Sequence, residues 1–210
     1  MPVTAIVYGN NADLIAEVAS LHVQEGDTIA DLTYGKGVFW RKCQHLDVTG
    51  SDIVTVPERP YDYRRTPYGD KAFDIAVLDP PYIHSPGNHT TDHRYQNAAT
   101  TKGLLQPEIM LNYALGMIEA KRIAKRQVWV KCKDQVQGGL QRWSHCELHN
   151  IGMSVGLYAR DLFILVADAQ TPRGRWKVQH HARKPHSYLW VFDIPSEQLI
   201  KRLTRERVWR

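Results

Sequence analysis

Short apolar runs separated by polar and glycine-containing segments are the main pattern of this chain. These runs predict buried strands at residues 28–33, 47–53, 73–78 and 127–132. Two later runs, residues 161–167 and 187–192, predict an antiparallel pair that closes the sheet. The pattern is typical of an α/β protein with a mostly parallel sheet.

Apolar residues at helical spacing predict helices between these strands. A turn and an amphipathic helix are expected over residues 8–21, a longer helix over residues 107–125, and a helical segment around residues 140–150. Residues 83–104 show no strong period and predict a long loop, either a mobile substrate loop that orders on its substrate or plain disorder. With 210 residues, the chain suits a single domain over residues 1–210.

Asp79, Pro80, Pro81 and Tyr82 follow the apolar run 73–78 directly. The prolines hold the backbone in a rigid extended form, which presents Asp79 at the carboxyl end of a strand, where α/β sheets bind ligands. A carboxylate oxygen and a neighbouring carbonyl can accept both N–H groups of a base amine, and Tyr82 can stack on a base rotated out of its helix. A proline-rich turn without a function is the alternative.

A second motif, Tyr34-Gly35-Lys36-Gly37, follows the predicted strand 28–33 and is expected to enter a helix. Two glycines one residue apart allow close approach to a nucleotide-like cofactor, but the fingerprints of dinucleotide and phosphate loops are incomplete. A carboxylate at Asp31 instead suits the cationic groups of a sulfonium cofactor. Asp52 lies about twenty residues further on, where an acid meets ribose hydroxyls in this kind of sheet, or it is a simple turn residue.

Together these motifs resemble class I S-adenosylmethionine-dependent DNA amino-methyltransferases over roughly residues 5–192. Their first motif usually reads Asp-Pro-Phe-x-Gly-x-Gly, and this chain departs from it at Leu32 and Thr33. The resemblance implies a Rossmann-like class I methyltransferase fold with a mostly parallel seven-stranded sheet, and S-adenosylmethionine as cofactor. The predicted catalytic residues are Asp79, Pro80, Pro81 and Tyr82. The predicted cofactor contacts are Asn10, Asp31, Thr33, Tyr34, Gly35, Gly37, Asp52, Ile53, Asp62, Tyr63 and Asp79.

The function that the resemblance implies is methyl transfer to the exocyclic amine of a flipped DNA base, with adenine N6 as first choice. Cytosine N4 methylation, an RNA amino-methyltransferase and a catalytically silent DNA-binding relative are the alternatives. The net charge of +5 and the pI near 9.1 favour an anionic partner, here double-stranded DNA. Residues 171–186 form a basic finger with predicted nucleic-acid contacts from Arg173, Arg175, Lys177, Arg183 and Lys184. A homodimer or a separate recognition partner are further sources of sequence specificity.

Metal and disulfide chemistry are not indicated. Cys43, Cys132 and Cys146 have no Cys-x-x-Cys spacing, and the histidines of the 83–104 loop do not match a zinc site. The chain opens without a recognisable leader and contains no run of membrane-spanning length, so a cytoplasmic protein that does not contact membranes is expected.

Overall fold

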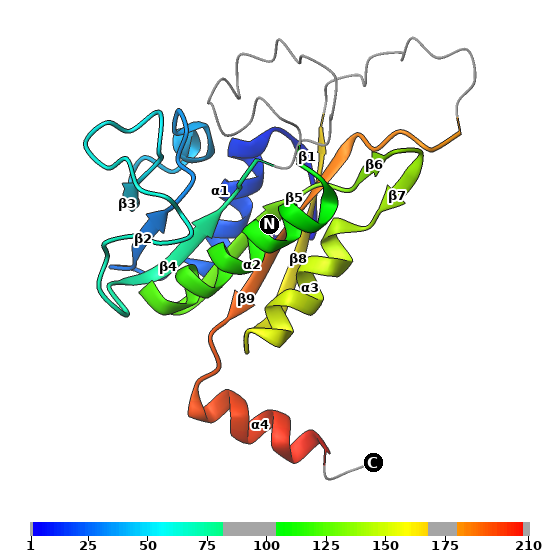
Figure 1. Ribbon diagram of the computed structural model, residues 1–210. Helices are drawn as coiled ribbons and strands as arrows, with labels where there is room; N and C mark the ends of the chain where they lie inside the picture. Colours follow the sequence, from blue (N-terminus) through cyan, green and yellow to red (C-terminus); the bar gives the residue numbers. More distant parts are fainter. Residues whose placement is uncertain (1, 82–103, 168–179, 208–210) are drawn as a thin grey trace.

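The computed structural model describes residues 2–81, 104–167 and 180–207 of the 210-residue chain. Seven strands form one sheet in the order β1-β8-β9-β5-β4-β2-β3 (Figure 1). The bounds of these strands are β1 Ile6–Gly9, β2 Thr28–Asp31, β3 Asp47–Gly50, β4 Phe73–Leu78, β5 Ala124–Cys132, β8 Tyr158–Ala167 and β9 His186–Asp193. Only β9 runs antiparallel to its two neighbours, β5 and β8. The prediction of a mostly parallel seven-stranded sheet with an antiparallel closing pair is confirmed.

Helices cover both faces of the sheet (Figure 1). One face packs against α1 (Asn11–His22) and the short 3-10 helix η1 (Val38–Lys42), and the other against α2 (Gln106–Ile123) and α3 (Ser144–Ser154). The strands divide their side chains between the two layers with a period of two. In β4, Ile75 and Val77 join the core on the α1 side, whereas Ala76 and Leu78 join the core on the α2 side.

Local predictions failed in three places. Residues 140–150 do not start a helix at 140: a hairpin of β6 (Gln135–Gln137) and β7 (Leu140–Arg142) comes first, turned by Gly138 and Gly139, and α3 begins at Ser144. Both glycines have positive φ, which a tight hairpin turn requires. The helix expected after the glycine loop is only the 3-10 helix η1, and strand β1 was not predicted.

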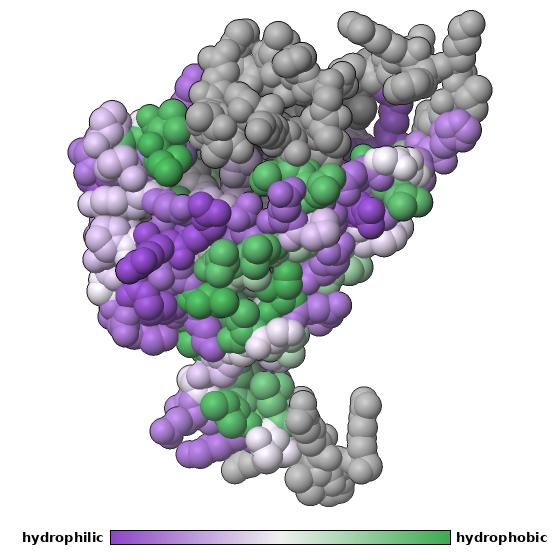
Figure 2. Space-filling model, viewed as in Figure 1, coloured by the Kyte–Doolittle hydropathy of each residue, from purple (hydrophilic) through white to green (hydrophobic). Residues whose placement is uncertain are grey.

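The remaining helix, α4 (Glu197–Arg207), lies away from the sheet at the opposite end from the β6–β7 hairpin (Figure 1). Figure 2 shows apolar surface gathered over α2 and α3, where Leu111, Leu115, Ile118 and Met153 are exposed. None of the described helices combines the length and apolar character needed to cross a bilayer.

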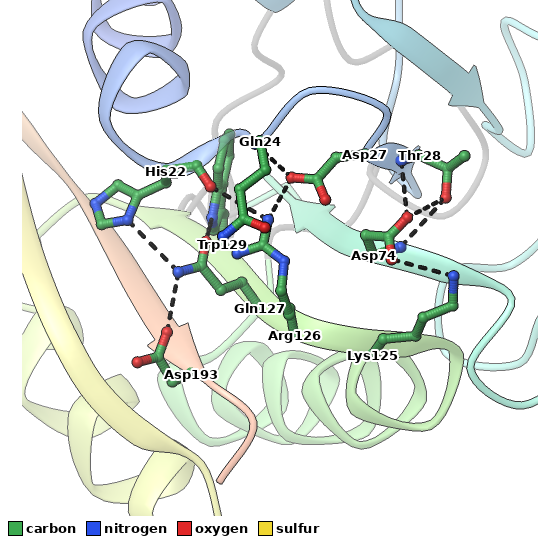
Figure 3. A network of polar contacts seen from close by, with 10 residues as sticks. All are labelled: His22, Gln24, Asp27, Thr28, Asp74, Lys125, Arg126, Gln127, Trp129 and Asp193. Atoms are coloured by element: carbon green, nitrogen blue, oxygen red, sulfur yellow. Dashed lines mark hydrogen bonds and ion pairs between the residues drawn. The ribbon is translucent and has the colours of Figure 1, made fainter. Parts of the chain in front are cut away.

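A polar network closes the amino edge of the sheet, where β2, β4 and β5 begin (Figure 3). Asp74 Oδ2 accepts bonds from the Thr28 N–H and hydroxyl, both at 2.9 Å, and Asp74 Oδ1 pairs with Lys125 at 3.1 Å. Gln127 bridges the next strands, since its amide donates to Asp193 (2.9 Å) and its carbonyl accepts from the Trp129 indole (3.1 Å). These contacts of Asp74 and Gln127 link β2, β4, β5 and β9 at this edge.

We expect Asp74→Asn to lower the free energy of unfolding by about 1–3 kcal/mol at neutral pH. Burial acts to raise the pKa of Asp74, but hydrogen bonds from Thr28 and Lys125 outweigh it, so the pKa lies below the usual 3.8. The stabilisation is therefore present above pH 3.8 and is lost as the pH falls through the folded pKa. Urea unfolding at neutral and acid pH checks this. Asp47→Asn, at an exposed acid of β3, is the control. An equal loss of stability at both pH values in Asp74→Asn would contradict the assignment.

Candidate active site at the carboxyl ends of three strands

Three ionisable side chains end three adjacent parallel strands on one face of the sheet. Asp31 is the last residue of β2, Asp79 follows β4, and Lys131 is the penultimate residue of β5. Alternation along each strand puts all three on the side of α1 and η1, the side that Ile29, Val77 and Trp129 also face. The order of the strands thus creates a row of acid, acid and ammonium group.

Asp31 is 2% exposed and accepts only neutral donors among the described residues. The Trp40 indole N–H donates to Oδ2 at 2.7 Å, and the Thr33 N–H donates to Oδ1 at 3.0 Å. Burial raises the pKa of Asp31 to about 6 against these hydrogen bonds, and the nearby charge of Asp79 adds to the shift. A buried carboxylate in this state favours a cationic ligand.

Asp79 has one oxygen paired and the other available. Oδ2 lies 3.6 Å from Lys131 Nζ, while Oδ1 is buried and has no hydrogen-bond partner in the described structure. The side chain is 19% exposed; burial raises the pKa of Asp79, and the Lys131 ammonium opposes part of that rise. Pro80, buried, and Pro81, half-buried, offer no N–H to this carboxylate.

Thr33 connects the glycine loop to the Asp79 segment. The Asp79 N–H donates to Thr33 Oγ1 at 2.7 Å, and the same hydroxyl lies 3.5 Å from Asp31 Oδ1. Thr33 stands where the resembling family usually has Phe, so the departure replaces an aromatic ring by a hydroxyl that fixes the spacing of the two acids.

Lys131 is the site residue that sequence reasoning placed least well. From sequence, Lys131 at the carboxyl end of the run 127–132 fits either a contact with a phosphate or the cofactor, or a surface position. In the structure its side chain is only 3% exposed, and its Nζ lies 5.9 Å from the centroid of the Phe39 ring. A lysine ending an apolar strand in phase with the buried Trp129 is the signal that could have identified it. Its function in this structure is to neutralise Asp79.

The glycine loop takes the tight geometry expected of it. Gly35 and Gly37 have φ of 56° and 65°, the left-handed region that favours glycine. The Tyr34 ring lies against Gly37 and Gly50, and a Cβ atom at either glycine would come within 2.6 Å of it. The ring therefore packs the loop onto the end of β3.

Asp52 and Ile53 lie in the next loop, beyond the end of β3 at Gly50. Asp52 Oδ1 accepts the N–H groups of Val54 (2.9 Å) and Thr55 (2.8 Å), so this acid shapes its own turn, and Ile53 is 58% exposed. The Thr55 hydroxyl donates to the Gly35 carbonyl at 2.7 Å. This bond brings the Asp52 loop beside the glycine loop, as a shared cofactor site requires.

Asp62 and Tyr63 are placed less favourably. Arg64 binds the Asp62 carboxylate through Nη2 at 2.6 Å and through its own N–H at 2.9 Å, and this pairing lowers the pKa of Asp62. The Tyr63 ring packs over Gly116 of α2, beside Leu78, and burial raises its pKa to about 12. Tyr63 is thus close to the end of β4, while Asp62 already has a partner; contact with an adenine ring stays a prediction for both.

Asn10 caps α1. Its side-chain oxygen accepts from the Ala12 N–H at 2.8 Å, and the Asn10 N–H donates to Asp13 Oδ2 at 2.9 Å. Asp13 also pairs with Lys42 of η1, which ties this turn to the helix after the glycine loop. The cap is the structural reading of Asn10; a cofactor contact stays a prediction.

Several predicted site residues lie outside the described part of the chain. They are Tyr82, all but Leu104 of the 83–104 loop, and Arg173, Arg175 and Lys177 of the basic finger. Arg183 and Lys184 are described and lie just before β9, Arg183 exposed and Lys184 half-buried. Among the described residues, no cluster of His, Cys, Asp and Glu could hold a metal ion.

No protein-family model matches this sequence, and no curated protein does. Solved structures do resemble the fold. A SAM-dependent methyltransferase from Methanosarcina mazei is 12% identical with a TM-score of 0.53, covering 86% of this chain and 98% of its own. Magnesium protoporphyrin IX methyltransferase from Synechocystis PCC 6803, with bound SAH, is 11% identical with a TM-score of 0.55, covering 88% and 81%.

A third neighbour is 1,6-didemethyltoxoflavin-N1-methyltransferase from Burkholderia thailandensis, at 12% identity and a TM-score of 0.53, covering 89% of this chain and 79% of its own. At such identities the likeness establishes the fold alone. The chain therefore has the Rossmann-like fold of SAM-dependent methyltransferases, as the sequence predicted.

We expect Asp31→Asn to become more stable relative to the wild type as the pH rises. The folded pKa of Asp31, about 6, lies above the usual 3.8. The wild type therefore has its full stability below pH 3.8, where Asp31 is protonated in both states, and loses stability as the pH rises through 6. The difference in free energy of unfolding, variant minus wild type, should rise by about 3 kcal/mol between acid and neutral pH. Denaturant titrations across this range measure it, and a flat difference would show that Asp31 titrates normally.

Lys131→Met should cost about 3–5 kcal/mol of stability at neutral pH, because it leaves the Asp79 carboxylate buried without its counter-charge. The double variant Lys131→Met/Asp79→Asn should recover most of this loss, since no uncompensated charge remains. A double-mutant cycle by urea unfolding measures the coupling. Equal and additive losses from the two substitutions would mean that the pair does not interact.

Proposed function

We propose that this protein is an S-adenosylmethionine-dependent methyltransferase that acts on the exocyclic amine of a DNA base, with adenine N6 as the target. The observation that carries the proposal is Asp79 Oδ1, a buried acceptor without a partner in the described structure, at the carboxyl end of β4 and directly before two prolines. Such an atom suits an N–H donor on a ligand.

The cofactor half of the proposal is supported by Asp31 and the glycine loop. Asp31 is a buried carboxylate with a raised pKa and neutral partners, so an ammonium or sulfonium group nearby would stabilise its charge. The left-handed Gly35 and Gly37 allow close backbone approach, and Asp52 lies in the neighbouring loop for ribose hydroxyls. Two of the structural neighbours contain bound S-adenosylhomocysteine (SAH). When bound, S-adenosylmethionine supplies an activated methyl group on a cationic sulfur.

The part of the proposal that concerns the substrate amine depends on which oxygen of the Asp79 carboxylate Lys131 contacts. Because the ammonium lies beside Oδ2, an amine is left with Oδ1 and with the carbonyl groups of the proline segment. Two acceptors that hold both N–H groups direct the nitrogen lone pair out of the amine plane, toward a methyl donor. Catalysis of this kind comes mainly from alignment. Tyr82, for stacking on the base, lies outside the described residues.

The choice of DNA and of adenine rests on sequence. Asp79, Pro80, Pro81 and Tyr82 form the signature of the resembling DNA amino-methyltransferases, and Asp at its first position favours adenine N6. The net charge of +5 suits a polyanionic substrate. Double-stranded DNA as partner and a cytoplasmic location remain part of this proposal.

Incubation with methyl-labelled S-adenosylmethionine and unmethylated duplex DNA, followed by digestion to nucleosides, tests the proposal. We expect N6-methyladenine from the wild type and a loss of about 100-fold or more in rate for Asp79→Ala, because the amine loses its orientation. Asp47→Ala, at an exposed acid of β3, is the matched control and should retain activity.

The products distinguish the alternatives. Label on cytosine N4 would keep the mechanism and change the base, and label on RNA alone would replace the substrate. Cofactor binding without any transfer would favour a silent DNA-binding relative. An Asp79→Ala variant as active as the control would refute the assignment of Asp79.

A further inference from the structure

The β6–β7 hairpin and the segment before β9 lie together at the carboxyl edge of the sheet. His181 Nε2 is 2.7 Å from the Gly139 carbonyl at the hairpin turn, and Lys184 Nζ is 6.0 Å from the centroid of the Trp143 ring, just after β7. Figure 1 shows the hairpin at the edge where β4 and β5 end. We call Lys133, Arg142, Trp143, Arg183 and Lys184 the hairpin surface.

Two basic residues of this surface, Lys133 and Lys184, lie near His186, the first residue of β9. Burial lowers the pKa of His186, Asp134 opposes the shift, and the charges of Lys133 and Lys184 lower it further, so both lysines are near the imidazole. Cys132 pairs with Tyr188 across β5 and β9, which places Lys133 beside the start of β9. The surface thus lies at the ends of β5, the neighbour of β4, and β9, the next strand, along the same edge as Asp79.

Three cations of the hairpin surface, Lys133, Arg142 and Lys184, differ from many other cations among the described residues. Many cations elsewhere pair with acids, as in Lys42–Asp13, Arg122–Asp70, Lys125–Asp74, Arg126–Asp27 and Arg160–Asp193. Within the described structure, Lys133, Arg142 and Lys184 have no carboxylate at ion-pair distance, and Arg142 Nε is buried without any partner. Two nearby acids already have partners: Asp134 is buried and lies 2.9 Å from His145, and Glu147 Oε1 accepts from the Gln106 amide at 2.8 Å. Unpaired cations in one place favour an anionic ligand.

Trp143 adds an aromatic face to these charges. It is 54% exposed, although its backbone is fixed as the cap of α3, where its carbonyl accepts from Cys146 and Glu147 N–H at 3.1 Å. His145 meets the ring edge-on at 6.2 Å. An exposed, rigidly held aromatic ring among cations is the combination that binds a nucleic-acid strand, by stacking a base and neutralising phosphates.

We propose that the hairpin surface binds a DNA strand, with Trp143 stacking on a base and Lys133, Arg142, Arg183 and Lys184 contacting phosphates. This inference rests on the proposed function and deepens it, because it names the surface that would hold the strand whose base reaches Asp79. Only Arg183 and Lys184 were predicted from sequence; the hairpin residues were not. Duplex DNA with an opened base pair exposes both the phosphates and the base that the surface needs.

Binding can be measured without turnover, by fluorescence anisotropy of a fluorescein-labelled duplex and its single strand at several salt concentrations. We expect Arg142→Gln to weaken binding and to reduce the slope of log K against log salt by about 0.9, the effect of one lost phosphate contact. Lys201→Gln, which removes the same charge from the exposed helix α4, should leave the DNA affinity and the salt slope unchanged.

Trp143→Ala should weaken binding about tenfold with little change in the salt slope, since stacking is not ionic. Leu111→Ala, which truncates an equally exposed apolar residue on α2, is its control. Thermal melts of each variant that match the wild type show that the fold is intact.

The outcomes separate this inference from the proposed function. Variant-sensitive DNA binding supports it even if no methyl group is transferred. Unchanged affinity and slope in Arg142→Gln and Trp143→Ala would overturn it, even if the protein methylates DNA. Equal competition by polyglutamate, or tighter binding of RNA of the same sequence, would overturn the assignment to DNA.

Discussion

The buried pair of Asp79 and Lys131 is the interaction on which the candidate site depends. Two adjacent parallel strands end with opposite charges on the same face, so each makes the burial of the other tolerable. Since Lys131 lies beside one carboxylate oxygen, the other is left buried and without a partner in the described structure. One ion pair therefore gives the site both its stability and its unsatisfied acceptor.

Charge in the site is nevertheless unbalanced, because Asp31 adds a second acid and no second cation. Thr33 holds the two acids at a set spacing through its hydroxyl, and Trp40 supplies a neutral donor to Asp31. The resulting rise in the pKa of Asp31 to about 6 is a cost to the folded protein at neutral pH. A cost of this kind is typical of a site prepared for a ligand of the opposite charge.

The two edges of the same sheet differ in how their polar side chains are paired. At the amino edge, Asp74, Lys125, Gln127 and Asp193 satisfy one another, and the network joins neighbouring strands (Figure 3). At the carboxyl edge, Asp79 Oδ1 and Arg142 Nε are both buried without partners in the described residues. Arg126 Nε at the amino edge is likewise buried without a partner among the described residues, so the carboxyl edge differs mainly in the kind of group it leaves free, a carboxylate oxygen at a strand end.

Sequence alone determined the class of fold, the positions of most strands, and the placement of Asp79 directly after a strand, because apolar runs and a period of two are local properties of the chain. It predicted the strand at 28–33 two residues too long, so that the position of Asp31 as the last residue of β2 came from the structure. Local signals were misread where β7 of the β6–β7 hairpin, which follows a Gly-Gly turn, occupies the start of the helix expected around residues 140–150. Only the tertiary structure placed Lys131 beside Asp79 and brought Lys184 near Trp143. The pairing of Asp79 with Lys131 and of Lys184 with Trp143 joins residues far apart in sequence, and depends on which strands become neighbours and in what register. That choice is made by the packing of the whole sheet.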